Sequence, residues 1–179
     1  QTMSLNNLFI TTMTNYSEKF PVESIFPNEI IENTLGKILS DADKIQLRIA
    51  ETEKYAHVTY FFDGYRDKPF NGEYKVLIPS KKTLKVDSAP EMMAKEISSR
   101  IIESISEGGF DFILANFANT DIMAHTGNFE AAVKAIEVID EEVGKIMNMA
   151  LKNNATLIIT SDHGHVEEML NSYTGERET

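Results

Sequence analysis

The sequence contains no cysteine among its 179 residues, and basic residues are scarce relative to acidic ones. The absence of cysteine excludes disulfide bonds and thiolate metal sites, and it is compatible with a reducing compartment. Lys and Arg total 17 against 28 Asp and Glu, which gives a formal net charge of -11. This balance argues against nucleic-acid binding, which needs clustered Lys and Arg, but it leaves room for local basic sites for a phosphorylated substrate.

Long apolar runs are also missing. No run reaches the ~18 residues of a membrane span, and the beginning of the sequence has no signal-peptide pattern. We therefore expect no membrane partner and a cytoplasmic location. The hydrophobic share of 42% and the charged share of 25% are typical of a globular protein, and the length fits one domain with a sizeable core.

Strand-like and helix-like segments alternate along the chain. The expected strands are residues 8–12, 45–50, 74–78, 110–117 and 155–160, and the expected helices are residues 28–39, 90–107 and 128–152. Residues 53–62 fit a strand by composition and a helix by spacing. The buried side of the last helix is expected to contain Ala131, Ala135, Val138, Val143, Ile146, Met147 and Ala150. The alternation predicts an α/β fold with a mostly parallel sheet and helices on both faces.

Two Asp/His pairs follow expected strands. Asp121 and His125 come after residues 110–117, and Asp162 and His163 come after residues 155–160. A carboxylate with an imidazole suits Mn²⁺ or Zn²⁺. Taken alone, the first pair also fits a loop start with a helix cap, and the second also fits a loop rich in turn-forming residues.

Together the two pairs are more informative, because one long helix joins the strands that precede them. A right-handed crossover would make these strands parallel and would place both pairs at the same sheet edge. Two Asp/His pairs at one edge favour a two-metal centre, which stabilises the attacking and leaving oxygens in phosphoryl transfer.

Lys54 follows the expected strand at residues 45–50, close to Glu51 and Glu53. Its ammonium group could contact a phosphate as a point charge. The alternative is a solvated surface run of Glu and Lys residues. His57, slightly further on, fits a packed or hydrogen-bonded structural residue better than a metal ligand.

Three ordered strings resemble signatures of the cofactor-independent phosphoglycerate mutases. They are QLRIAETEKYAHVTYFF (residues 46–62), NFANTDIMAHTGNFEAAVKAIEVID (residues 116–140) and TSDHGHVEEM (residues 160–169). The resemblance covers nearly the whole chain from Leu8. It implies an incomplete alkaline-phosphatase-like fold, in which residues 1–179 are the C-terminal part of the metal-binding phosphatase-like domain. The N-terminal segment of that domain, and the transferase domain inserted into it, would lie outside this sequence.

The resemblance also implies a function. Members of the family interconvert 3-phosphoglycerate and 2-phosphoglycerate in glycolysis, through a phosphoserine intermediate, usually with two Mn²⁺ ions and without 2,3-bisphosphoglycerate. Asp121 and His125 resemble ligands of one ion, and Asp162 and His163 resemble ligands of the other. Lys54 resembles the lysine that reaches the phosphate. We expect a monomer at full length.

The family pattern is not complete in this chain. The nucleophilic serine is missing, and a third histidine ligand of the first ion would lie just beyond Thr179. We therefore expect the chain alone to be inactive. His165 stands where the family commonly has Asn, and its role is open. Two alternatives remain: another phosphomutase or phosphodiesterase of the alkaline-phosphatase superfamily, and a non-catalytic α/β module.

Overall fold

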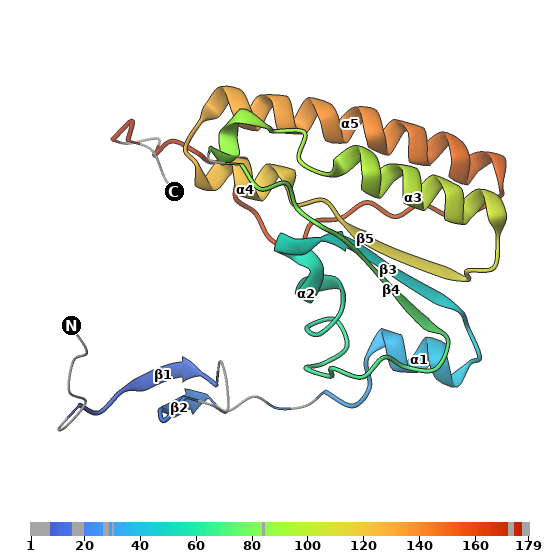
Figure 1. Cartoon of the computed structure of the whole chain (residues 1–179), viewed down its shortest axis with the longest axis horizontal. Helices are drawn as coiled ribbons and strands as arrows, with labels where there is room; N and C mark the ends of the chain where they lie inside the picture. The colour runs from blue at the N-terminus through green and yellow to red at the C-terminus, as the bar shows by residue number, and fades with distance from the viewer. Residues whose placement is uncertain are drawn as a thin grey trace.

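A three-stranded parallel sheet forms the centre of the molecule, in the order β4-β3-β5 (Figure 1). The computed structural model describes residues 8–15, 20–26, 29, 31–83, 85–171 and 174–176. The central strand β3 is Gln46–Glu51, with β4 (Glu73–Ile78) on one side and β5 (Phe112–Asn116) on the other. A separate pair of short parallel strands is formed by β1 (Thr11–Thr14) and β2 (Glu23–Phe26).

Helices cover both faces of the three-stranded sheet (Figure 1). One face carries α3 (Ala94–Glu107) and α5 (Phe129–Lys152), and the other carries α1 (Leu35–Asp41) and α2 (Tyr55–Val58). The remaining helical pieces are α4 (Asn119–His125), η1 (Thr52–Lys54) and η2 (Val86–Ser88). The expected α/β fold is thus confirmed. Within the described residues, no helix combines the length and the apolar character that a membrane crossing requires.

Strand β3 is buried along its whole length, and its two faces meet different surroundings. Side chains alternate between the faces of a strand. Leu47 and Ile49 pack with Ile97 and Ile101 of α3 and with Ile146 of α5 in one apolar cluster. Between them, Gln46 and Arg48 are also fully buried, although both are polar. Burial on both faces fixes the position of β3 and of the residues that follow it.

A network of buried polar groups surrounds Arg48. Its Nη2 donates to Gln46 Oε1 at 2.6 Å and lies 3.7 Å from Asp63 Oδ1. Lys75 Nζ lies 3.3 Å from the other Asp63 oxygen. Burial, reinforced by the charge of Glu73, raises the pKa of Asp63 to about 6 against the opposing effects of Arg48 and Lys75. On this face of the sheet, the charged groups of Arg48 and Asp63 are therefore fully buried, and Lys75 is largely buried.

Several expected boundaries move. The helix expected from residue 28 begins at Leu35, where the Thr34 side chain accepts a hydrogen bond from Lys37 N. Residues 28 and 30 of that prediction lie outside the described residues. The strand expected at residues 8–12 is found at Thr11–Thr14, and the helix expected from residue 90 begins at Ala94. Residues 53–62, which the sequence left open, form helical turns.

The prediction of a buried strand at residues 155–160 is wrong. These residues have no assigned strand and are all exposed, Ile158 to 81%. A strand needs a neighbour to pair its backbone groups. Within the described residues, β5 pairs only with β3, so the segment runs unpaired towards the site. Met147, expected on the buried side of α5, is likewise 45% exposed.

Candidate metal centre

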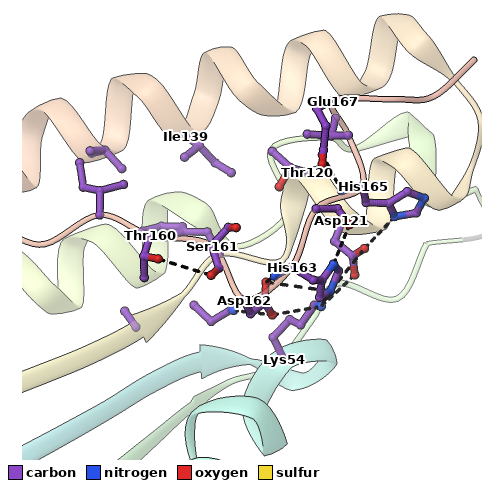
Figure 2. Close-up of a pocket in the computed structure, with 17 residues that line it drawn as sticks. Lys54, Thr120, Asp121, Ile139, Thr160, Ser161, Asp162, His163, His165 and Glu167 are labelled. Carbon is purple, nitrogen blue, oxygen red and sulfur yellow. Dashed lines mark hydrogen bonds and ion pairs between the residues drawn. The ribbon is translucent and has the colours of Figure 1, made fainter. Parts of the chain in front are cut away.

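Four of the five predicted site residues, Lys54, Asp121, Asp162 and His163, gather at the carboxyl end of the sheet (Figure 2). The fifth, His125, lies beside Asp121. Lys54 ends η1, directly after β3. Asp121 and His125 lie in α4, which follows β5. Asp162 and His163 lie in the loop after the unpaired segment. A cavity of about 390 Å³ opens among these elements. Of the five predicted site residues, all except His125 line this cavity.

Lys54 connects the two Asp/His pairs. Its Nζ lies 2.9 Å from Asp121 Oδ2, 3.5 Å from Asp162 Oδ2 and 3.2 Å from His163 Nε2. The side chain is only 6% exposed, so the alternative of a solvated surface lysine is wrong. Because Lys54 directly follows the buried strand β3, its ammonium group lies next to Asp121, Asp162 and His163 (Figure 2).

Asp121 is the most strongly contacted carboxylate of the site. Burial by itself would raise its pKa, but hydrogen bonds from His165 and Lys54, together with the charge of Lys54, lower the pKa to about 2. Its Oδ1 lies 3.4 Å from His125 Nε2, because four residues make just over one turn of α4 and bring both side chains to one helix face. Asp121 is therefore ionised at neutral pH and available as a ligand.

Asp162 is held from two sides. Asn116, the last residue of β5, donates from Nδ2 to Asp162 Oδ2 at 3.3 Å, and Lys54 lies near the same oxygen. Burial opposes ionisation, but the charge of Lys54, a backbone hydrogen bond and the charge of His163 together lower the pKa of Asp162. The sequence analysis did not single out Asn116. Its place at the carboxyl end of a central-sheet strand is the signal that could have identified it.

The tautomer of His163 follows from its contacts. Its Nδ1 lies 3.1 Å from the carbonyl oxygen of Gly164, and a carbonyl oxygen only accepts hydrogen bonds. Nδ1 therefore carries a proton, and Nε2 keeps a lone pair that faces Lys54 Nζ. Metal-ligating histidines commonly donate their other ring N–H to a backbone carbonyl in this way.

The remaining histidines differ in their relation to the site. His165 lies inside it, with Nδ1 2.9 Å from Asp121 Oδ1. His57 packs edge-on against Phe61, with ring centroids 5.5 Å apart. Burial, and then the charge of Lys54, lowers the pKa of His57. His57 is nevertheless an exposed residue, so the expectation of a packed residue is met only by this one ring contact.

The donor atoms fit a divalent cation. Bonds of about 2.0–2.2 Å to nitrogen and oxygen in a tetrahedral site place neighbouring ligand atoms roughly 3.3 Å apart. Asp121 Oδ1 and His125 Nε2 are separated by 3.4 Å. Asp162 Oδ1 and His163 Nε2 are 4.0 Å apart, on side chains that are 37% and 46% exposed and have room to rotate.

Comparison with known proteins shows the family of the chain. The profile of the metalloenzyme superfamily matches residues 6–177. The chain belongs to the metalloenzyme superfamily. It is 49% identical over 167 residues to a 2,3-bisphosphoglycerate-independent phosphoglycerate mutase of Pseudomonas entomophila, and 50% identical over 171 residues to one of Clostridium botulinum. These alignments cover 93% and 95% of the chain but only 33% and 34% of the relatives, so the chain spans about a third of their length.

A solved structure shares the fold of this superfamily member. Crystal structures of the phosphoglycerate mutase of Leishmania mexicana, determined at low cobalt concentration, superpose with a TM-score of 0.83 and 25% sequence identity. The superposition covers 94% of this chain and 31% of the Leishmania chain. The parallel sheet with its covering helices is therefore an architecture that phosphoglycerate mutases use.

Proposed function

We propose that the chain supplies the metal-binding residues of a two-metal centre that interconverts 3-phosphoglycerate and 2-phosphoglycerate without 2,3-bisphosphoglycerate. The observation that carries this proposal is the position of Lys54, whose single ammonium group contacts carboxylates from both Asp/His pairs. Lys54, Asp121, Asp162 and His163 thus line a single cavity, and His125 adjoins it through its contact with Asp121. The close relatives, all named as phosphoglycerate mutases, support the choice of substrate.

Each residue has a role in the proposed reaction. Asp121 and His125 hold one divalent ion, and Asp162 and His163 hold the other. When bound, the ions neutralise charge on the transferring phosphoryl group and lower the pKa of the attacking hydroxyl group. Lys54 adds a fixed positive charge that donates to phosphoryl oxygens as their negative charge grows. Asn116 orients Asp162 through its amide.

Further properties belong to the same proposal. We infer Mn²⁺ as the metal, a phosphoserine intermediate whose serine lies outside this chain, and a cytoplasmic role in glycolysis. We also infer that the full-length enzyme is a monomer. Because the chain spans about a third of its relatives, we expect the 179 residues alone to be inactive as a mutase.

The test is a mutase assay on a protein of the relatives' length that contains this chain, measured without 2,3-bisphosphoglycerate, after chelation and after Mn²⁺ addition. Asp162→Ala and His125→Ala should each reduce activity by at least about 100-fold, because each removes a ligand of an ion that acts on the transition state. Asp67→Ala, at an exposed position, is the control. Unchanged activity in either ligand variant, or hydrolysis of phosphodiesters in place of mutase activity, would contradict the proposal.

A further inference from the structure

Glu51, the last residue of β3, is a carboxylate that is fully buried three residues before Lys54. Its Oε2 accepts a hydrogen bond from Ser80 Oγ at 2.9 Å. Burial raises the pKa of Glu51, whereas the hydrogen bonds from Ser80 and from the Met93 backbone lower it. This carboxylate therefore joins the end of β3 to the loop after β4 and to the start of α3.

The loop after β4 also contacts the turn that carries Lys54. In the sheet register, Glu51 lies beside Ile78, the last residue of β4, so the two strands end together. The backbone N–H of Ser80 then donates to Thr52 Oγ1 at 3.1 Å. Thr52 begins η1, which Lys54 ends. Ser80 therefore bonds both to the buried carboxylate and to the first residue of the turn of Lys54.

The start of α3 is connected in the same way to the helix that carries Asp121. Met93 precedes the first residue of α3, and its own side chain makes no capping hydrogen bond. A carboxylate is favourable at such a position, because the first N–H groups of a helix lack partners within the helix. Three residues before Met93, the carbonyl oxygen of Pro90 accepts a hydrogen bond from Asn119 Nδ2 at 2.8 Å, and Asn119 begins α4.

We propose that Glu51 is a positioning residue that holds the ammonium group of Lys54 against Asp121, an inference that rests on the proposed function. Lys54 Nζ and Asp121 Oδ2 are 2.9 Å apart, although they belong to elements that follow different strands. Glu51 is linked to both elements, through Ser80 to η1 and through the segment before α3 to α4. The placement of this charge matters for the rate, because a displacement of about 1 Å can cost on the order of 100-fold.

The first test measures how accessible Lys54 is in the 179-residue chain. Lysines are acetylated briefly and mapped by mass spectrometry, with Lys75 of the Arg48 network, whose side chain is 17% exposed, as the internal reference. Glu51→Gln and Ser80→Ala should each raise the acetylation rate of Lys54 by at least about 10-fold, because each disrupts a hydrogen bond to the buried carboxylate. The rate at Lys75 should not change.

Two control variants match these substitutions. Ser80→Thr keeps the hydroxyl group that donates to Glu51. Glu96→Gln removes the charge of an exposed carboxylate in the first turn of α3. Both variants should leave Lys54 as slow to react as in the unsubstituted chain.

The second test asks whether Glu51 acts through Lys54. In a protein of the relatives' length, Glu51→Gln should lower kcat/KM by roughly 10- to 100-fold, whereas Glu96→Gln should not change it. When Glu51→Gln is added to Lys54→Met, the further loss should be less than about 2-fold, because the group that Glu51 positions is already gone.

The outcomes separate this inference from the proposed function. Equal acceleration at Lys54 and Lys75 would show that Glu51 only supports the fold, and unchanged acetylation of Lys54 in both variants would also overturn the inference. So would a loss from Glu51→Gln that is the same with and without Lys54. If the unsubstituted protein of the relatives' length shows no mutase activity, the proposed function is wrong, while selective acceleration at Lys54 would still support the link to Glu51.

Discussion

Lys54 contacts a carboxylate of each Asp/His pair in the candidate site. Because its ammonium group contacts Asp121 and Asp162, it competes with cations for the same carboxylates and also provides positive charge for a phosphate. These two effects predict opposite consequences for metal binding and for turnover, and they can be separated with one variant.

Lys54→Met should lower mutase activity in the relatives-length protein by roughly 100- to 1,000-fold, the usual loss when a donor to developing charge is removed. The same variant should bind Co²⁺ at least as tightly as the unsubstituted protein, because a neighbouring positive charge has gone. Lys81→Met, at a lysine that is 44% exposed, is the control for activity. Normal turnover in Lys54→Met would show that Lys54 has only a structural role.

Asp63 predicts a pH dependence of stability. Its pKa is about 6 in the folded chain, because of burial and the charge of Glu73, against an ordinary value of 3.8. A carboxyl group with a raised pKa favours folding below its unfolded pKa, and this contribution is lost as the pH rises through the folded pKa. The unfolding temperature should therefore fall between pH 4 and pH 6 from this group.

The matched variants are Asp63→Asn and Asp67→Asn, the second at an exposed aspartate of the same loop. Thermal unfolding from pH 3.8 to pH 6.5, followed by circular dichroism, should show a smaller slope for Asp63→Asn and an unchanged slope for Asp67→Asn. An equal slope in all three proteins would show that Asp63 does not titrate in this range. The lowered pKa of Asp121, at about 2, acts mainly below this window, and its remaining effect near pH 4 is the same in all three proteins.

At the scale of the elements, substitution of two helical glycines by alanine should change the stability of the fold in opposite directions. A Cβ on Gly36 in α1 would lie 2.8 Å from Asp63 Oδ1 and 3.0 Å from Arg48 Nη2, whereas a Cβ on Gly144 in α5 would meet nothing within 4 Å. Gly144→Ala should stabilise the protein by up to about 1 kcal/mol through helix propensity. Gly36→Ala should destabilise it by roughly 1–3 kcal/mol, because the buried charged neighbours cannot move away cheaply.

Urea unfolding of the two alanine variants measures both effects with the same substitution in the same kind of element. Stabilisation by both would mean that the Arg48 network can move to admit a methyl group. Destabilisation by both would place Gly144 in closer packing than the structure shows.

The sequence predicts an element well where local residue patterns and burial in the core favour the same structure. Strand β3 and the start of α5 are found where expected, because apolar periodicity and the Asn128 cap, which accepts from Ala131 N, agree there. The prediction for residues 155–160 was wrong because the composition of a segment indicates its preference for a strand. It does not indicate whether a neighbouring strand is present to pair with it.

The same division applies to the site. Lys54 and the pair of Asp121 and His125 follow the parallel strands β3 and β5, and residues at the carboxyl ends of parallel strands converge. Asp162 and His163 reach the same place although the segment before them is not a strand. The contact of His165 with Asp121 could not be predicted, since it depends on how the loop after residue 163 turns back over α4. Asn116 was missed because an amide at a strand end carries no distinctive spacing.

At the scale of the whole molecule, the unpaired segment leaves an apolar surface. Leu157, Ile158 and Ile159 are 37%, 81% and 68% exposed. Such a patch favours association between copies in water. The isolated chain should therefore self-associate as its concentration rises, despite its net charge of -11.

Ile158→Asn should reduce this association, measured by light scattering across a concentration series, and should leave the unfolding temperature nearly unchanged because the side chain has little packing to lose. Ile146→Asn, at a residue of the apolar cluster that is 5% exposed, should instead destabilise the fold strongly. Equal scattering by the unsubstituted chain and Ile158→Asn would show that this surface does not drive association.

The position of β3 in the middle of the sheet also determines the order in which the chain can fold during synthesis. Gln46 must pair with Glu73 on one side and with Phe112 on the other, and both partners leave the ribosome after it. At about 5–20 residues per second, β5 follows β3 by on the order of several seconds. Throughout that interval, β5 is not yet available to pair with β3, so the strand that carries Arg48 and Leu47 is covered on one edge only. The nascent chain therefore passes through a stage in which its central strand has been made but lacks one of its two neighbouring strands.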